Sequence, residues 1–425
     1  MNQAIPARAK LWNRDFTLLA TGQIVSIFGN MVLSFALPLY ILDISESAAL
    51  FGLVLGMPYI SLLLMSPIGG IMADRLKKQR VMFWLDLTTT VIIVLYMIAS
   101  GLVASAVPIV LAKLMALNAI QGAYMPAVQA SIPALAPPNK LVSANSIVTT
   151  INMTANLLAP AVAGALYGGF GLFPILVISA ICFAITAVMD LLIRIPFKKQ
   201  SSAGSVAQMV KSDISASLKF IVKEKPILGK AAGIMFWPNL VIVSLLFVGL
   251  PVIVVQHLGF SMALVGVNQS GVGIGGLLGG IAAGALGERL TTRRIYLTLA
   301  IGALLLVPMA LAVMLDIPAF AAFIAITASG ALSMALMQVS SIPLIAFIQK
   351  ETPTELIGKV MSLIMILPFL AQGLGQVFYG ALFELLEHIP WIIAFTTAIL
   401  VAIIALFSRS VIGNEVKKIE ERDPK

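Results

Sequence analysis

The chain has 425 residues, of which 60% are hydrophobic and only 11% are charged. A soluble domain carries about 25% charged residues, so this composition, with a mean hydropathy of +1.04, excludes an ordinary soluble protein. A net charge of +9 is compatible with a nucleic-acid partner, but the positions of the basic residues, given below, argue against one.

Twelve apolar segments follow one another along the chain. A helix that crosses a bilayer needs about 20 mostly apolar residues, and each of these segments is long enough or nearly so. They lie at roughly 16–42, 48–72, 80–101, 107–133, 142–168, 172–194, 231–256, 262–286, 294–315, 318–348, 356–384 and 390–410. The sequence therefore predicts an all-α polytopic membrane protein with twelve transmembrane helices.

One connection between these segments is long, polar and basic, and it divides them six and six. We expect residues 1–195 to form an N-terminal six-helix bundle, residues 196–230 a cytoplasmic linker, and residues 231–425 a C-terminal six-helix bundle with a basic tail. Apolar residues at helical spacing between Val206 and Val222 indicate an amphipathic helix on the membrane surface within the linker. A solvated tether is the alternative.

The lysines and arginines lie on one side of the predicted membrane. If the N-terminus is cytoplasmic, the cytoplasmic loops receive almost all of them, whereas the outer loops carry acids such as Asp43 and Glu46 and no lysine or arginine. This pattern follows the positive-inside rule. It places both termini in the cytoplasm, and it explains the basic charge without nucleic acid.

Short matches relate the two halves of the chain at a nearly constant offset. Residues 49–52 (ALFG) match residues 263–266 (ALVG), and residues 164–166 (GAL) match residues 380–382 (GAL). Matches in the same order and at the same places relative to the spans indicate a duplicated half. Parallel repeats of six spans occur in one large class of secondary transporters.

Residues 70–80 (GIMADRLKKQR), between the second and third predicted helices, resemble motif A of the major facilitator superfamily, and residues 284–294 (GALGERLTTRR) resemble a weaker copy. The resemblance implies two six-helix bundles and transport by alternating access. It also implies that a gate is formed by Gly70, Asp74, Arg75, Lys78, Arg80, Gly284, Glu288 and Arg289. We expect Gly70 to allow a close helix contact, and Asp74 to meet the N-terminus of the eleventh helix.

Two further resemblances concern the kind of transporter. Residues 155–164, with Ala159, Pro160 and Gly164, resemble motif C of drug/proton antiporters, and residues 13–29 resemble the macrolide-efflux-like branch of bacterial exporters. They imply a drug-efflux type of exporter for amphipathic small molecules in a bacterial plasma (inner) membrane, with protons as the candidate coupling ion. Asn118 replaces the arginine of motif B, which leaves proton coupling open.

Polar side chains inside a span usually face protein or water. In the family that the chain resembles, helices 1, 4, 7 and 10 line a central cavity, and our candidates for substrate contact are Gln23, Asn30, Lys113, Asn118, Gln121, Asn152, Asn156, Trp237, Asn239 and Gln338. Lys113 is the only basic residue away from the cytoplasmic side. A cavity role and an anchor that snorkels to the outer surface are both open. Asp86 is expected to pair with Arg75 or Arg80.

Other classes of function remain as alternatives. A uniporter, or a carrier of lipid-like solutes without proton coupling, is favoured by the lack of an acid at mid-membrane. A membrane-embedded enzyme is remote, since the chain has two histidines and no metalloprotease, hydrolase or P-loop motif. We expect no enzyme activity, no cofactor and no metal. The expected partners are a small-molecule substrate, membrane lipid and, for a coupled exporter, protons, and the expected state is a monomer.

The one-sided distribution of basic residues predicts the topology. Reporter fusions at both termini and within residues 196–230 should all report a cytoplasmic location, because translocating so many basic residues is disfavoured. A fusion that placed the linker outside the cell would contradict the whole assignment of spans.

Overall fold

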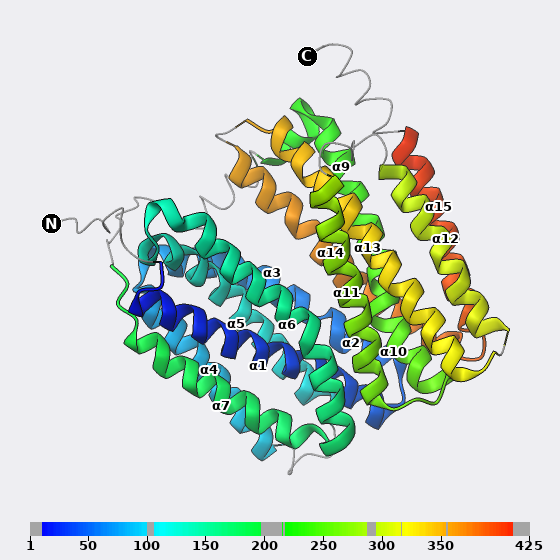
Figure 1. Ribbon diagram of the computed structural model, residues 1–425, viewed down its shortest axis with the longest axis horizontal. Coiled ribbons are helices and arrows are strands. Elements are labelled where there is room, and N and C mark those ends of the chain that lie inside the picture. Colours follow the sequence, from blue (N-terminus) through cyan, green and yellow to red (C-terminus); the bar gives the residue numbers. More distant parts are fainter. Residues whose placement is uncertain are drawn as a thin grey trace. The chain divides into compact units, whose positions relative to one another are not determined.

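The computed structural model describes residues 11–99, 106–196, 215, 217–286, 295–315, 317–353 and 356–410 (Figure 1). Within these ranges the regular structure is helical, and twelve helical stretches are long and apolar enough to cross a membrane. The predicted all-α fold with twelve spans is therefore confirmed. Glu288, Arg289 and most of the 196–230 linker, including the first part of its expected amphipathic helix, lie outside the described residues.

The first six spans contain a break in the second one. They are formed by α1 (Arg14–Ser45), α2 (Ala48–Gly56) with α3 (Pro58–Arg75), α4 (Lys78–Ala99), α5 (Ala106–Leu135), α6 (Leu141–Phe170) and α7 (Leu172–Leu192). Met57 separates α2 from α3, and Pro58 is the first residue of α3. Proline suits this position because its missing N–H would have had no intrahelical partner.

Among the last six spans, the seventh is α-helical up to Pro238 and then largely π-helical up to His257. They are formed by α9 (Pro226–Pro238), η3 (Asn239–Val243), η4 (Leu245–Gly249), α10 (Leu250–Val252) and η5 (Ile253–His257), then α11 (Met262–Leu286), α12 (Ile295–Met314), α13 (Ala319–Glu351), α14 (Ile357–Leu385) and α15 (Trp391–Ser408). Two short turns, η1 (Pro138–Lys140) and η2 (Phe220–Glu224), precede α6 and α9.

The chain forms two compact units. One contains Met1–Ser45 and Met57–Gly204, and the other contains Glu46–Gly56 and Ser205–Lys425. The boundary near residue 204 falls within residues 196–230, and α2 packs with the second unit. The reason is a glycine contact: a β-carbon on Gly52 would meet the backbone of α14 at Gly380.

Equivalent helices pair within each unit. In the first unit α3 packs against α5 and α4 against α7, and in the second unit α11 packs against α13 and α12 against α15. Small residues bring the first pair of each unit together, since a β-carbon on Gly69 would meet the backbone of Ala123, and one on Gly275 would meet the backbone of Ala331. Such contacts hold helices in lipid, where the hydrophobic effect does not drive them together.

Gly69 makes the close contact of α3 with α5. Its β-carbon position meets the backbone of Ala123, whereas among the described residues nothing outside its own helix lies within 4 Å of the β-carbon position of Gly70. The expectation that Gly70 allows a close helix contact stays a prediction. One helix position corresponds to a turn of about 100° around the axis, which is enough to move a side chain off the contact face.

Gly275→Ala should destabilise the protein, because the added methyl group meets a neighbouring backbone that cannot move away independently. Overpacking of this kind costs about 1–3 kcal/mol. Gly280→Ala in the same helix is the matched control, since nothing lies within 4 Å of its β-carbon position, and removing a helical glycine gains about 0.5–1 kcal/mol. Thermal unfolding of the purified protein should show a lower melting temperature for the first variant only. Equal melting temperatures would contradict the contact.

Candidate functional site

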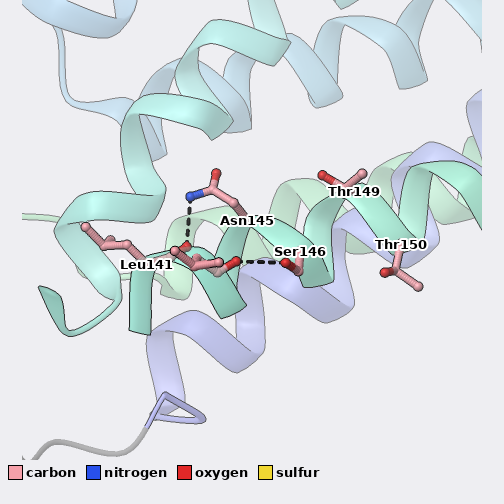
Figure 2. A pocket seen from close by; sticks show the side chains of 6 residues that line it. Leu141, Asn145, Ser146, Thr149 and Thr150 are labelled. Atoms are coloured by element: carbon pink, nitrogen blue, oxygen red, sulfur yellow. Dashed lines mark hydrogen bonds between the residues drawn. The ribbon is translucent and has the colours of Figure 1, made fainter. Parts of the chain in front are cut away.

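The N-terminal half of α6 carries a polar face inside a membrane span. Its side chains line an open hollow of about 570 Å³ that is formed by Leu141, Val142, Asn145, Ser146, Thr149 and Thr150 (Figure 2). The polar members of this set are exposed on the unit. Because a polar group in a span faces protein or water rather than lipid, this face of α6 is the strongest candidate for contact with a polar or amphipathic substrate.

Three asparagines extend this face with a common geometry. The side-chain nitrogens of Asn145, Asn152 and Asn156 each donate a hydrogen bond of 2.9 Å to the carbonyl oxygen four residues earlier. Figure 2 shows that the amide oxygen of Asn145 then points away from the bond that holds its nitrogen. The stripe therefore offers acceptor oxygens, and the complementary ligand carries hydrogen-bond donors.

Small buried residues follow the asparagines toward the C-terminal end of α6. Ala155, Ala159, Ala163 and Gly164 are buried, and the main packing partner of α6 in its unit is α1. Pro160 is part-buried within the same helix, where it removes one backbone donor. Ala159 lies about two turns after Asn152 and therefore on nearly the same side of the helix. Ala159 and Gly164, two residues of the helix 5 motif, are thus buried in the part of α6 that follows the asparagines.

Lys113 lies inside the first unit. Its side chain is only 4% exposed, and its Nζ is 3.9 Å from the centre of the Tyr96 ring in α4. Nζ has no hydrogen-bond partner among the described residues. A cation over an aromatic ring gains about 2 kcal/mol when desolvated, and a lysine at the centre of a span costs about 2.5–3.5 kcal/mol. This position does not fit an ammonium that snorkels to the surface.

The other candidates of the first unit are divided between its interior and its surface. Gln23 is 1% exposed, and its Nε2 donates a 2.9 Å hydrogen bond to the Tyr124 hydroxyl. It therefore lies in the core of the unit, although we expected it to line a cavity. Asn30, Asn118 and Gln121 are part-buried, and Asn118 donates to the backbone of its own helix at Leu114.

In the second unit, two candidates lie close to one small cavity. Asn239, at the start of η3, lines a cavity of about 30 Å³ together with Ser340 and Ser341 of α13. The Ser341 hydroxyl also donates to the Gln338 side chain at 3.2 Å. Trp237 is half exposed. The structure thus brings the seventh and tenth spans together at polar side chains.

The residues of the first motif A copy lie at the junction of α3 and α4. Asp74 and Arg75 end α3, Lys78 begins α4, and Arg80 follows two residues later. Asp74, Arg75 and Arg80 are exposed. In the second copy, Gly284 has open space at its β-carbon position among the described residues. The gating role of these residues stays a prediction.

Two buried acids were not among the predicted site residues. Asp86 of α4 and Asp190 of α7 are each 2% exposed, and each has one carboxyl oxygen without a hydrogen-bond partner among the described residues. Asp86 was expected to pair with Arg75 or Arg80, but it lies beside the Thr186 hydroxyl and within electrostatic range of Asp190. The available signal was an acid in each of two apolar helices, since such an acid requires a partner.

Comparison with known proteins finds similarity over nearly the whole chain. The sequence model of the Major Facilitator Superfamily matches residues 19–375. Macrolide efflux protein A of Streptococcus pyogenes is 20% identical over 410 residues, which cover 96% of this chain and 98% of that protein.

Solved structures show the same fold at low sequence identity. A nucleoside transporter aligns with a TM-score of 0.72 at 13% identity, covering 93% of this chain and 99% of that chain. A bacterial homologue of the human lysosomal transporter Spinster aligns with a TM-score of 0.69 at 16% identity, covering 93% and 96%. A peptide transporter aligns with a TM-score of 0.72 at 14% identity, covering 97% of both chains.

Lys113→Met should leave the protein folded with an unchanged or higher melting temperature, because it keeps the apolar stem and removes a buried charge. If Lys113 contributes to substrate handling, initial transport rates in liposomes should fall. Lys140→Met, which removes an exposed lysine, should change neither quantity. Wild-type transport rates for Lys113→Met and Lys113→Arg would remove Lys113 from the site.

Proposed function

Since this chain belongs to the Major Facilitator Superfamily and is a membrane transporter, we propose that it is a secondary active exporter of amphipathic small molecules. Export would proceed by alternating access, in which the two repeats move against each other around a substrate site. The observation that carries this proposal is the polar face of α6, because it presents acceptor oxygens along a span.

The surroundings of this face support an amphipathic substrate. The large side chains of Val142 and Met153, which lie next to this face on the same helix, are exposed by 82% and 53%. A molecule with an apolar body and an ammonium, amide or hydroxyl group could bury its body against such side chains while donating to the asparagine oxygens. Ligand sites generally combine a mostly apolar lining with a few polar groups in this way.

The direction of transport is supported by the whole-length likeness to macrolide efflux protein A. The solved structures that align with this chain include a nucleoside transporter and a peptide transporter. At their low sequence identity they support the fold alone. A small-molecule substrate, a bacterial plasma membrane, cytoplasmic termini and a monomeric state complete the proposal.

Transport by purified protein in liposomes tests this function. A radiolabelled macrolide should be moved by the wild-type protein. Asn145→Leu with Asn152→Leu should lower the rate severalfold, because the variants keep the bulk and remove the acceptors. Thr396→Val is the control, since Thr396 lies exposed on α15 and bonds only to its own helix. If no macrolide or cationic dye is transported by the wild-type protein, the drug-efflux assignment is wrong.

Asp74→Asn should reduce transport while the amount of folded protein stays the same. Asp74 is an exposed anion at the end of α3, and its proposed role is to meet the positive N-terminal end of another helix. An exposed charge of this kind contributes little to folding. Glu387→Gln, in the exposed loop before α15, is the control and should transport normally. Unchanged transport by Asp74→Asn at equal expression would remove Asp74 from the gate.

A further inference from the structure

A buried polar cluster lies where four helices of the first unit meet. It contains Gln23 of α1, Asp86 of α4, Tyr124 of α5 and Asp190 of α7, none of them more than 3% exposed. In this unit α4 packs against α5 and α7, and α1 packs against the same two helices. The cluster is therefore enclosed by protein and is separate from the exposed polar face of α6.

Hydrogen bonding in this cluster lacks donors. Three buried oxygens have no partner among the described residues: Oε1 of Gln23, Oδ2 of Asp86 and Oδ2 of Asp190. All three are acceptors unless a carboxyl is protonated. A buried acceptor without a donor is costly, so an arrangement with three of them requires an explanation.

Two nearby donors already have acceptors. The Gln23 amide donates to the Tyr124 hydroxyl at 2.9 Å. The Thr186 hydroxyl donates to the carbonyl oxygen of Phe183 at 3.0 Å and is also within hydrogen-bond range of the Asp86 carboxyl, and its single hydrogen cannot fully serve both acceptors. A protonated Asp86 would instead donate to the Thr186 oxygen, which makes both bonds complete.

The charges in the cluster also favour protonated carboxyl groups. The titratable groups that interact with the two acids are each other and Tyr124, which lies within electrostatic range of both. Thr186 beside Asp86, and Gln23 and Ser26 from α1, do not titrate. None of these partners is a cation. Two negative charges in such surroundings disfavour each other and are poorly solvated.

We propose that Asp86 and Asp190 form a proton-binding site that couples export to the proton gradient. Each carboxyl holds one proton when the site is closed as described, which removes two buried negative charges and turns the two orphan carboxyl oxygens into donors. Export uses the release and uptake of at least one of these protons, in which a carboxyl becomes a carboxylate and is protonated again. The coupling part rests on the proposed function, whereas the binding of protons does not.

Infrared spectroscopy of the purified full-length protein tests proton binding without any substrate. With isotope-labelled aspartate, the wild-type protein should show the carbonyl band of protonated carboxyls at neutral pH, and the band should disappear at high pH. Asp86→Asn and Asp190→Asn should each remove about half of the band. Asp43→Asn removes an exposed aspartate outside the cluster and should leave the band unchanged.

The proposal is overturned if the labelled wild-type protein shows no protonated aspartate at neutral pH. It is also overturned if sodium chloride, but not choline chloride, removes the band at constant pH, because the site would then take a metal cation. Asparagine has nearly the shape of a protonated aspartate, so the variants should fold. If one does not, the titration of the wild-type band still decides the result.

Coupling is measured separately in liposomes with a macrolide. Asp86→Asn should still exchange the macrolide across the membrane at equilibrium. The accumulation of macrolide that an imposed pH gradient drives should be at least tenfold lower than with the wild-type protein. Gradient-driven accumulation at the wild-type level would overturn the coupling role. If the wild-type protein moves no macrolide at all, the proposed function is wrong. The infrared measurement then still decides whether Asp86 and Asp190 bind protons.

Discussion

The hydrocarbon core of a membrane offers no hydrogen bonds, so a polar group on a spanning helix needs a partner in the protein or contact with water. The rest of this structure depends on how that constraint is met. Most backbone groups meet it by forming helices. The polar side chains of the spans meet it in three different ways: Asn145 and its neighbours bond to their own helix and stay exposed, Lys113 lies over the Tyr96 ring, and Asp86 and Asp190 are enclosed together.

Close packing of the helices fixes the positions of these polar groups. Glycine and alanine bring α3 to α5 and α11 to α13, and the same pairs in both units follow from the repeated halves of the chain. The second span is a special case, since α2 packs with the second unit and α3 with the first. The chain therefore passes between the units at Ser45–Glu46 and at Gly56–Met57 as well as near residue 204.

The proposed substrate face and the proposed proton site lie in one unit and share a neighbour. In this unit α6 packs against α1, and α1 also packs against α7, which carries Asp190. Gln23 of α1 takes part in the acidic cluster through Tyr124. Protonation of the acids and binding at the α6 face can thus act on one helix. An energetic link between two sites requires such an element with two arrangements.

The sequence by itself determined the class of fold, because the length and spacing of apolar segments depend on bilayer thickness and little else. It also determined the family, through residues 70–80 and the repeated halves, and it offered Asn152 and Asn156 of α6 as candidate site residues. Only the tertiary structure decided which side of each helix is covered. Gly69 rather than Gly70 meets α5, Gln23 points into the core rather than to a hollow, and Lys113 finds Tyr96 of another span. The pairing of Asp86 with Asp190 joins residues more than a hundred positions apart, and a single sequence contains no information on such distances because helix rotation and helix neighbours are set by packing.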